Sequence, residues 1–310
     1  MDEKGVIAGI RSYMARLQEE KRFSTAKSYQ DALNSLVRYR GTKEIPYEEI
    51  NKENLRRYEA HLIGRGCARN TISTYMRRLR CVYNMAVEKG EVEYIPNLFR
   101  DVFTGIESKR KKSLSIEDQH TLMTASLEDG CLRETQLALC LMYQYGGMPF
   151  VDFAHLKADN IKKGMLAYKR QKTGTPMLIE ILDTAEVMRQ ELSKRTSAAG
   201  RYLFPFLSGK NEGFAEYREY NTALAHFNRN LKALGKAVGL ASDITSYSIR
   251  HSFAMALKER NVPIEMISEL LGHKSIKTTQ IYLRSFSLDK QTAVNYSCFE
   301  SVYHFVPKAG

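Results

Sequence analysis

The chain has 310 residues, of which 43% are hydrophobic and 26% charged, the composition of an ordinary soluble globular protein with room for two domains. No run approaches about eighteen apolar residues and the first residues lack the apolar core of a signal peptide, so we expect no membrane segment and a cytoplasmic protein. The net charge of +12 and the isoelectric point near 9.3 indicate a polyanionic partner, because neutralising phosphates releases condensed counterions.

Helical patterns fill the N-terminal third of the chain. Residues 12–41 divide into two such patterns near Phe23, residues 47–66 give a third, and residues 71–90 give a fourth that Gly90 would end. The stretch after it, residues 108–118, is short, basic and poor in apolar residues, as exposed linkers are. We therefore predict a helical domain over residues 1–108, a basic linker over 109–112 and a second domain over 113–310.

The positive charge is concentrated in the first part of the chain. Residues 1–112 hold 23 Lys and Arg against 15 Asp and Glu, which is +8 of the total +12. Residues 60–87 contain no acidic residue. Polar side chains that suit phosphates and base edges are interleaved with the arginines, namely Asn70, Thr71, Ser73 and Thr74. An arginine-rich helix face can be merely solvated, but this mixture favours DNA. The candidate DNA-binding residues are Arg65, Arg69, Arg77, Arg78 and Arg80.

The second domain is predicted to be mainly helical with one small β-hairpin. Ser115 precedes two acidic residues, as at a helix start, and residues 134–145 form a strongly apolar helix. Residues 165–171 and 176–182 read as two strands joined by a turn that contains Lys172. The five cysteines are scattered, with no C-x-x-C pair and no Cys/His cluster at zinc-ligand spacing, so we expect reduced thiols and no metal site.

Three further helices are predicted near the end of the chain. Ser246 reads as the N-cap of a helix that carries Arg250, and Pro263 opens another helix that Gly272 would end, just before His273. Ser275 would cap the last helix. Its residues Ile276, Thr279 and Leu283 are expected to face inward and to leave Tyr282 off the packed face.

These residues resemble a known signature. The stretch LGHKSIKTTQIYL, with a Leu-Gly-His, a Thr-Thr pair and a tyrosine nine residues beyond the histidine, is similar to the closing motif of the tyrosine recombinases, the lambda integrase family. The R-H-S-F-A helix at Arg250, the K-T-G turn at Lys172 and the basic helical N-terminal domain stand in the family's order. The resemblance is closest to integrases of conjugative and transposable elements. It implies a SAM-like core-binding domain followed by a mixed α/β catalytic domain.

The resemblance also implies an activity, site-specific DNA recombination. Tyr282 would attack a phosphodiester to give a 3′-phosphotyrosyl intermediate, Arg250 and His273 would bind the non-bridging oxygens, and Lys172 would protonate the leaving 5′ oxygen. No metal, ATP or other cofactor is implied. The implied partners are double-stranded DNA, a homotetramer on two synapsed duplexes and, in some systems, a DNA-bending accessory protein. We expect the tail, residues 289–310, to dock on a neighbouring protomer.

The chain departs from the family pattern at two positions. The family's first catalytic arginine lies three residues before an acidic residue, here Asp152, and its place is taken by Pro149. Arg133, Lys157 or a rearrangement on DNA are the candidate replacements. The family's H-x-x-R histidine is replaced by Tyr247, which stays a candidate site residue because a phenol can donate to a phosphate. Two alternatives therefore remain open: a catalytically impaired DNA-binding protein of the same fold, and an unrelated DNA-binding regulator.

Overall fold

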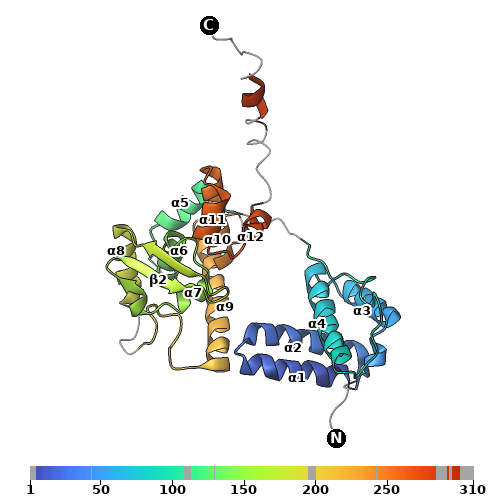
Figure 1. Ribbon diagram of the computed structural model, residues 1–310. Helices are drawn as coiled ribbons and strands as arrows, with labels where there is room; N and C mark the ends of the chain where they lie inside the picture. The colour runs from blue at the N-terminus through green and yellow to red at the C-terminus, as the bar shows by residue number, and fades with distance from the viewer. Residues whose placement is uncertain are drawn as a thin grey trace. The chain divides into compact units, whose positions relative to one another are not determined.

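The computed structural model describes residues 5–42, 44–107, 113–128, 130–194, 200–241, 243–283, 292 and 295–300, with the backbone alone for Ile281 and Tyr282. The chain divides into two compact units (Figure 1), one of Met1–Arg110 with Glu212–Tyr217 and one of Lys111–Asn211 with Arg218–Gly310. Among these residues no helix is long and apolar enough to cross a membrane. Most of the predicted docking tail, residues 289–310, lies outside the described residues.

The first unit is helical. Its elements are α1 (Val6–Glu19), α2 (Phe23–Arg40), the 3-10 turn η1 (Tyr47–Glu49), α3 (Lys52–Gly64) and α4 (Arg69–Glu88). Apolar residues spaced by three and four bury one face of each α-helix, including Leu17, Tyr29, Tyr58 and Met76. Helix α4 ends as predicted: Gly90 takes a positive φ of 74°, and the N–H groups of Gly90 and Glu91 bond back to the carbonyls of Val87 and Ala86.

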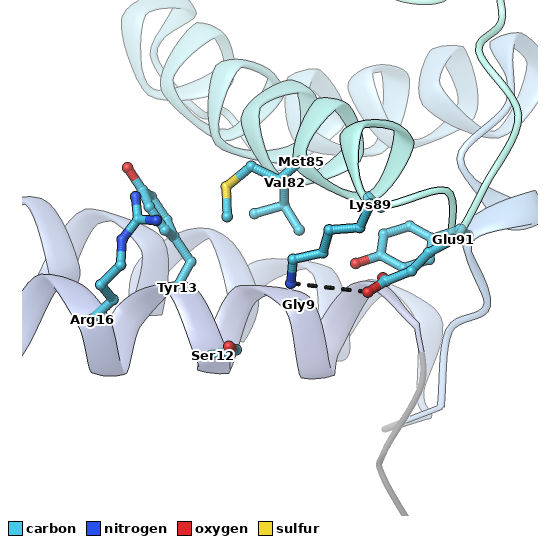
Figure 2. Close-up of a pocket in the computed structure, with 10 residues that line it drawn as sticks. Gly9, Ser12, Tyr13, Arg16, Val82, Met85, Lys89 and Glu91 are labelled. Atoms are coloured by element: carbon cyan, nitrogen blue, oxygen red, sulfur yellow. Dashed lines mark ion pairs between the residues drawn. The ribbon is translucent and has the colours of Figure 1, made fainter.

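A hollow lies between α1 and α4 in this unit (Figure 2). An added methyl group at Gly9 would collide with the Tyr47 hydroxyl and come within 2.9 Å of Val82, so a glycine is needed inside α1 for this close approach. At the rim, Lys89 pairs with Glu91 at 3.9 Å. Both side chains are exposed, so this ion pair contributes little to stability.

The second unit is mixed but mainly helical. From Ile116 onward the chain forms α5 (Ile116–Thr124), α6 (Gly130–Gln144), α7 (Phe150–Ala154), η2 (Ala158–Asn160), β1 (Ile161–Lys162), β2 (Met165–Lys169), β3 (Pro176–Glu180), α8 (Asp183–Ser193), α9 (Gly213–Ala237), which belongs to this unit from Arg218 on, α10 (Ser246–Glu259), α11 (Ile264–Leu270) and α12 (Ile276–Tyr282). Its core is built on stacked aromatic rings: Phe150 lies 4.5 Å from Phe227, and Phe153 lies 4.4 Å from Phe204. The predicted fold class, mainly α with a small sheet, is confirmed.

The sheet has three antiparallel strands in the order β1-β2-β3. In the β2–β3 hairpin Met165 pairs with Glu180 and Lys169 with Pro176. The Arg170 N–H then donates to the Thr175 carbonyl at 2.9 Å and closes a turn around Lys172. The hairpin is where the sequence predicts it, while the short strand β1 was not predicted.

Two details of the predicted helices are wrong, the N-cap of α10 and the buried face of α12. The N-cap of α10 is Thr245, not Ser246, because Thr245 and Ser248 form a reciprocal capping box, while the Ser246 N–H donates to the Asn228 side chain at 2.8 Å. In α12, Thr279 and Leu283 are buried as expected, but Ile276 is 41% exposed. The seven-residue helix therefore packs along a narrower face than the sequence pattern indicates.

Candidate active site

Arg250 is held under the surface of the second unit by two backbone carbonyls. It lies on α10 with 5% of its surface exposed, donates through Nη1 to Gly147 O at 3.0 Å and through Nη2 to Leu271 O at 2.5 Å. Gly147 has a positive φ of 64°, and an added Cβ would come within 3.2 Å of the Arg250 backbone. The turn after α6 can approach the arginine this closely because it lacks a side chain there.

His273 is placed by the turn that ends α11. The N–H groups of Gly272 and His273 bond back to the carbonyls of Glu269 and Ser268, at 2.8 and 2.9 Å, which is the Schellman arrangement. Gly272 has a φ of 61°, and an added Cβ there would lie 2.6 Å from Arg170 Cδ. The predicted helix-ending glycine is thus needed both for the turn and for the packing of an arginine beside it.

The His273 ring is neutral at neutral pH. Burial, followed by the positive charges of Arg250, Arg170 and Lys172, lowers its pKa to about 4. Its Nδ1 lies 2.8 Å from Thr279 Oγ1, and its Nε2 lies 3.3 Å from Arg250 Nη2. The histidine is therefore in contact both with Arg250 and, through Thr279, with helix α12.

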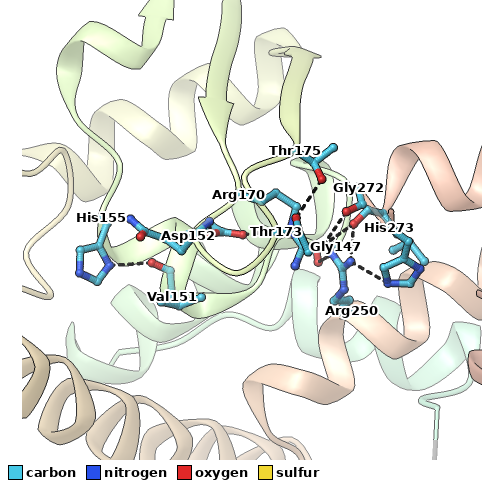
Figure 3. A network of polar contacts seen from close by, with 12 residues as sticks. Gly147, Val151, Asp152, His155, Arg170, Thr173, Thr175, Arg250, Gly272 and His273 are labelled. Carbon is cyan, nitrogen blue, oxygen red and sulfur yellow. Dashed lines mark hydrogen bonds and ion pairs between the residues drawn. The ribbon is translucent and has the colours of Figure 1, made fainter. Parts of the chain in front are cut away.

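Asp152 fixes the base of the hairpin that carries Lys172. Its Oδ1 accepts from the Gln171 N–H at 2.7 Å, and its Oδ2 accepts from Arg170 Nε at 3.3 Å, with both ionic side chains almost fully buried (Figure 3). Lys172 lies in the turn just beyond and is exposed. The carboxylate thus holds the strand end while the lysine side chain stays accessible.

Arg170 is the site residue that sequence reasoning missed. It is 6% exposed, and its Nη1 donates to Leu271 O at 2.6 Å and to Gly272 O at 3.3 Å. Arg170 and Arg250 therefore share the Leu271 carbonyl, and Figure 3 shows both arginines beside Gly272 and His273. A signal for it exists: along β2 the buried or half-buried residues Leu166 and Tyr168 alternate with exposed ones, and Arg170 continues the inward face. A charged side chain at such a position needs a special partner.

These residues surround one open pocket of about 730 Å³. Its lining includes Pro149, Arg170, Lys172, Tyr247, Arg250 and His273. Tyr247 is 46% exposed at the rim. Four cationic side chains line it, those of Arg170, Lys172, Arg250 and Lys274, and none of the described residues that line it is acidic, so the pocket favours an anion.

Arg133 and Lys157, the two candidate replacements for the missing arginine, do not line this pocket. Arg133 is committed to a two-bond ion pair with Glu191, with both N–O distances 3.0 Å, and Lys157 is an exposed residue at the N-cap of η2. Neither residue is among the described residues that line the pocket, and their role stays untested. Arg170, which directly follows β2, lines the pocket together with Arg250.

The nucleophile candidate stands at the end of α12. Tyr282 is the last residue of this helix, while its side chain lies outside what the structure describes. The helix is anchored on both sides of it, because Thr279 contacts His273 and the buried Lys258 donates to Leu283 O at 2.6 Å. The backbone that carries Tyr282 is therefore tied to α10 and to the His273 turn.

The predicted DNA-binding arginines of the first unit differ in their surroundings. Arg65, Arg69 and Arg80 are exposed, whereas Arg77 and Arg78 are partly buried. Two of them lie over aromatic rings, Arg69 over Phe103 at 4.4 Å and Arg78 over Tyr29 at 4.8 Å.

The polar residues between these arginines form hydrogen bonds within the first unit. The Asn70 side chain forms two hydrogen bonds with the Glu107 backbone, and Ser73 donates to Gly105 O at 2.5 Å. Thr74 donates to the Asn70 carbonyl. In the free chain these groups therefore stabilise the helix and the segment that follows it, and their contact with DNA stays a prediction.

Comparison with known proteins places the chain in a family. The model of the phage integrase family matches residues 112–288, more than half of the chain, and the model of the phage integrase SAM-like domain matches residues 6–98. The chain belongs to the phage integrase family. The resemblance to the tyrosine recombinases of the lambda integrase type is thereby confirmed.

Relatives of this integrase family cover most of the chain. Tyrosine recombinase XerA of Pyrococcus furiosus is 29% identical over 231 residues, 74% of each chain. The Tn1549 transposon integrase in complex with circular intermediate DNA matches with a TM-score of 0.67 at 14% identity, over 94% of this chain and 99% of its own. A lambda integrase tetramer bound to a Holliday junction matches with a TM-score of 0.63 at 19% identity, over 88% and 76%. These structures share the fold of this chain.

Proposed function

We propose that this integrase-family chain is a site-specific tyrosine recombinase that cleaves and rejoins duplex DNA, with Tyr282 as its nucleophile. One observation carries the proposal. Arg170, Lys172, Arg250 and His273 come from a strand end, a hairpin turn, a helix and a helix-ending turn, and line one pocket beside the helix that ends at Tyr282. A pocket with four cationic side chains, of which Lys274 is the fourth, and a neutral imidazole suits a phosphodiester in its transition state.

The proposed reaction exchanges one ester for another. The Tyr282 oxygen attacks the phosphorus and forms a 3′-phosphotyrosyl bond, while the bond to the 5′ oxygen breaks. The phenol loses its proton to water, and Lys172 protonates the leaving 5′ oxygen and regains its proton from water. In the second half of the reaction a 5′ hydroxyl of another strand attacks the phosphotyrosine and releases Tyr282. The phosphorus carries two ester bonds before and after each step, so no nucleotide is consumed.

Arg170 is the proposed replacement for the arginine that Pro149 displaces. Its Nε and Nη1 groups are engaged by Asp152 and by the 271–272 carbonyls, while Nη2 has no acceptor among the described residues. Two N–H groups are thus available toward the pocket, to which Arg170 contributes. Together with Arg250 it would bind both non-bridging oxygens of the scissile phosphate. Tyr247, at the rim, is placed to donate one further hydrogen bond.

The roles of the two domains are part of the same proposal. We assign residues 1–108 to DNA core binding, with Arg65, Arg69, Arg77, Arg78 and Arg80 near the backbone phosphates, residues 109–112 to a linker, and residues 113–310 to catalysis. Two observations support DNA as the partner: the net charge of +12 and the cationic pocket. Four protomers on two synapsed duplexes, with or without a DNA-bending protein, complete the proposed assembly.

The test uses nicked duplexes drawn from the DNA that flanks the protein's own gene. In a nicked duplex the short cleaved strand diffuses away, so the covalent intermediate accumulates. Wild type and Tyr282→Phe are incubated with the labelled duplexes and separated on a denaturing gel. An adduct from the wild type alone supports the proposal. DNA binding by both proteins in a native gel, with no adduct from either, would indicate a DNA-binding protein of this fold that has lost catalysis.

A further inference from the structure

Thr279 belongs to the closing sequence signature but has no role in the reaction as described above. It is fully buried on α12, and its hydroxyl lies 2.8 Å from His273 Nδ1. A buried hydroxyl this close to an imidazole must form a hydrogen bond, since an unpaired polar group would be costly. The direction of that bond depends on which ring nitrogen carries the proton.

The neighbouring arginine settles this direction in the free protein. Arg250 Nη2 lies 3.3 Å from His273 Nε2, and a guanidinium has donors but no acceptor. Nε2 must therefore be the acceptor in that contact. The ring proton of the neutral imidazole is then on Nδ1, from which it is donated to the Thr279 hydroxyl.

The proposed reaction requires the opposite arrangement. To donate to a phosphate oxygen in the pocket, His273 must carry its proton on Nε2, while Arg250 turns its own donors to the same phosphate. Nδ1 then becomes an acceptor, and its partner must supply a hydrogen. A backbone carbonyl could accept but never donate, whereas a hydroxyl can do both.

We infer that Thr279 is a positioning residue, whose hydroxyl accepts from His273 Nδ1 in the free protein and donates to Nδ1 once the phosphate is bound. Nδ1 loses a proton to water and Nε2 gains one from water, so the ring stays neutral and the count of protons is unchanged. The inference rests on the proposed function. Because Thr279 lies one helical turn before Tyr282, the same contact ties the His273 ring to the helix that carries the nucleophile.

Two variants and one matched control test this role. Thr279→Val removes the hydroxyl and keeps the shape of the side chain, whereas Thr279→Ser keeps the hydroxyl. Thr135→Val is the control, because Thr135 is likewise buried, at 2% exposure, and its hydroxyl bonds to Cys131 O on α6, away from the pocket lining. Adduct formation on nicked DNA should fall by about tenfold in Thr279→Val, as expected for one lost hydrogen bond. It should stay near the wild-type rate in Thr279→Ser and Thr135→Val, with DNA affinity unchanged in all three.

The tautomer is measured on the free protein. Two-bond ¹H–¹⁵N spectra of protein labelled with ¹⁵N-histidine, assigned with His273→Gln, should show the proton on Nδ1 in the wild type and in Thr279→Ser. A proton on Nε2 in the free wild type would overturn the inference. So would equal cleavage by Thr279→Val and wild type, or an equal loss in Thr279→Ser and Thr279→Val. An absence of adduct from the wild type itself would instead overturn the proposed function, and the positioning role of Thr279 with it.

Discussion

Replacement of Arg170 by glutamine should abolish most of the cleavage activity. The change removes a charged donor from the pocket in which a non-bridging oxygen is proposed to sit. The loss of one such donor typically costs about 2.7–4 kcal/mol in the transition state, or a factor of about 10²–10³ in rate. The rate of adduct formation on nicked DNA, measured with protein in excess, should fall by that factor. DNA binding in a native gel should change far less, because many other phosphate contacts persist.

The same change also affects folding, and a second variant separates the two effects. Arg170 and Asp152 are 6% and 1% exposed at their side chains, and loss of one partner of a buried pair costs roughly 3–5 kcal/mol of the free energy of unfolding. The double variant Arg170→Gln/Asp152→Asn leaves no unpaired charge, and its new amide can still accept from the Gln171 N–H. We expect thermal unfolding to return toward the wild type, while cleavage stays slow.

Arg133→Gln is the matched control for this series. Arg133 is the other candidate replacement for the arginine that is missing at Pro149. It pairs with Glu191, and the two side chains are 35% and 39% exposed. Such a pair contributes about 0–1 kcal/mol to stability. We expect near wild-type cleavage from this variant. A folded double variant that cleaves at the wild-type rate, or a large loss in Arg133→Gln, would refute the assignment of Arg170.

Three further predictions concern other groups. Lys172→Ala should slow cleavage by about 10²–10⁴, and a substrate with sulfur in place of the bridging 5′ oxygen should restore the rate, since a thiolate leaves without a proton; no rescue would exclude a general-acid role. His273 should make the fold less stable as the pH falls from 6.5 to 4, because the unfolded ring takes up a proton in that window and the native ring, with its pKa of about 4, does not. Urea unfolding should therefore show a shallower acid decline in His273→Gln, and equal slopes would contradict the lowered pKa. Each of Arg65→Gln and Arg80→Gln should reduce the slope of log K against log salt by about 0.9 if the residue contacts a phosphate, and an unchanged slope would remove it from the DNA interface.

The fold could be predicted where local signals agree with one another. Gly90 and Gly272 end helices because each adopts a positive φ that a glycine takes at little cost, and the sequence pattern around both shows this. The alternating residues of the β2–β3 hairpin and the turn at Lys172 are equally local. The helix carrying Arg250 and the position of His273 follow from the same kind of pattern.

The rest depends on contacts between distant parts of the chain. Arg170 is drawn into the pocket by the carbonyl of Leu271, 101 residues later, and nothing near Arg170 in the sequence predicts this partner. The side chains of Asn70 and Ser73 suit phosphates, but in the free chain the carbonyls of Glu107 and Gly105, more than thirty residues later, accept hydrogen bonds from them. Side-chain chemistry alone therefore predicts what a residue can bind, whereas the fold decides what it does bind.

The central claim is that Tyr282 forms the covalent bond to DNA. The most direct measurement is to isolate the protein–DNA adduct, digest it with nuclease and trypsin, and locate the nucleotide remnant by tandem mass spectrometry. Cleavage after Lys277 and Arg284 releases the peptide TTQIYLR, in which Tyr282 is the sole tyrosine. We predict the remnant on that tyrosine and no adduct from Tyr282→Phe. A remnant on any of the other tyrosines, or an adduct that survives the substitution, would contradict the account.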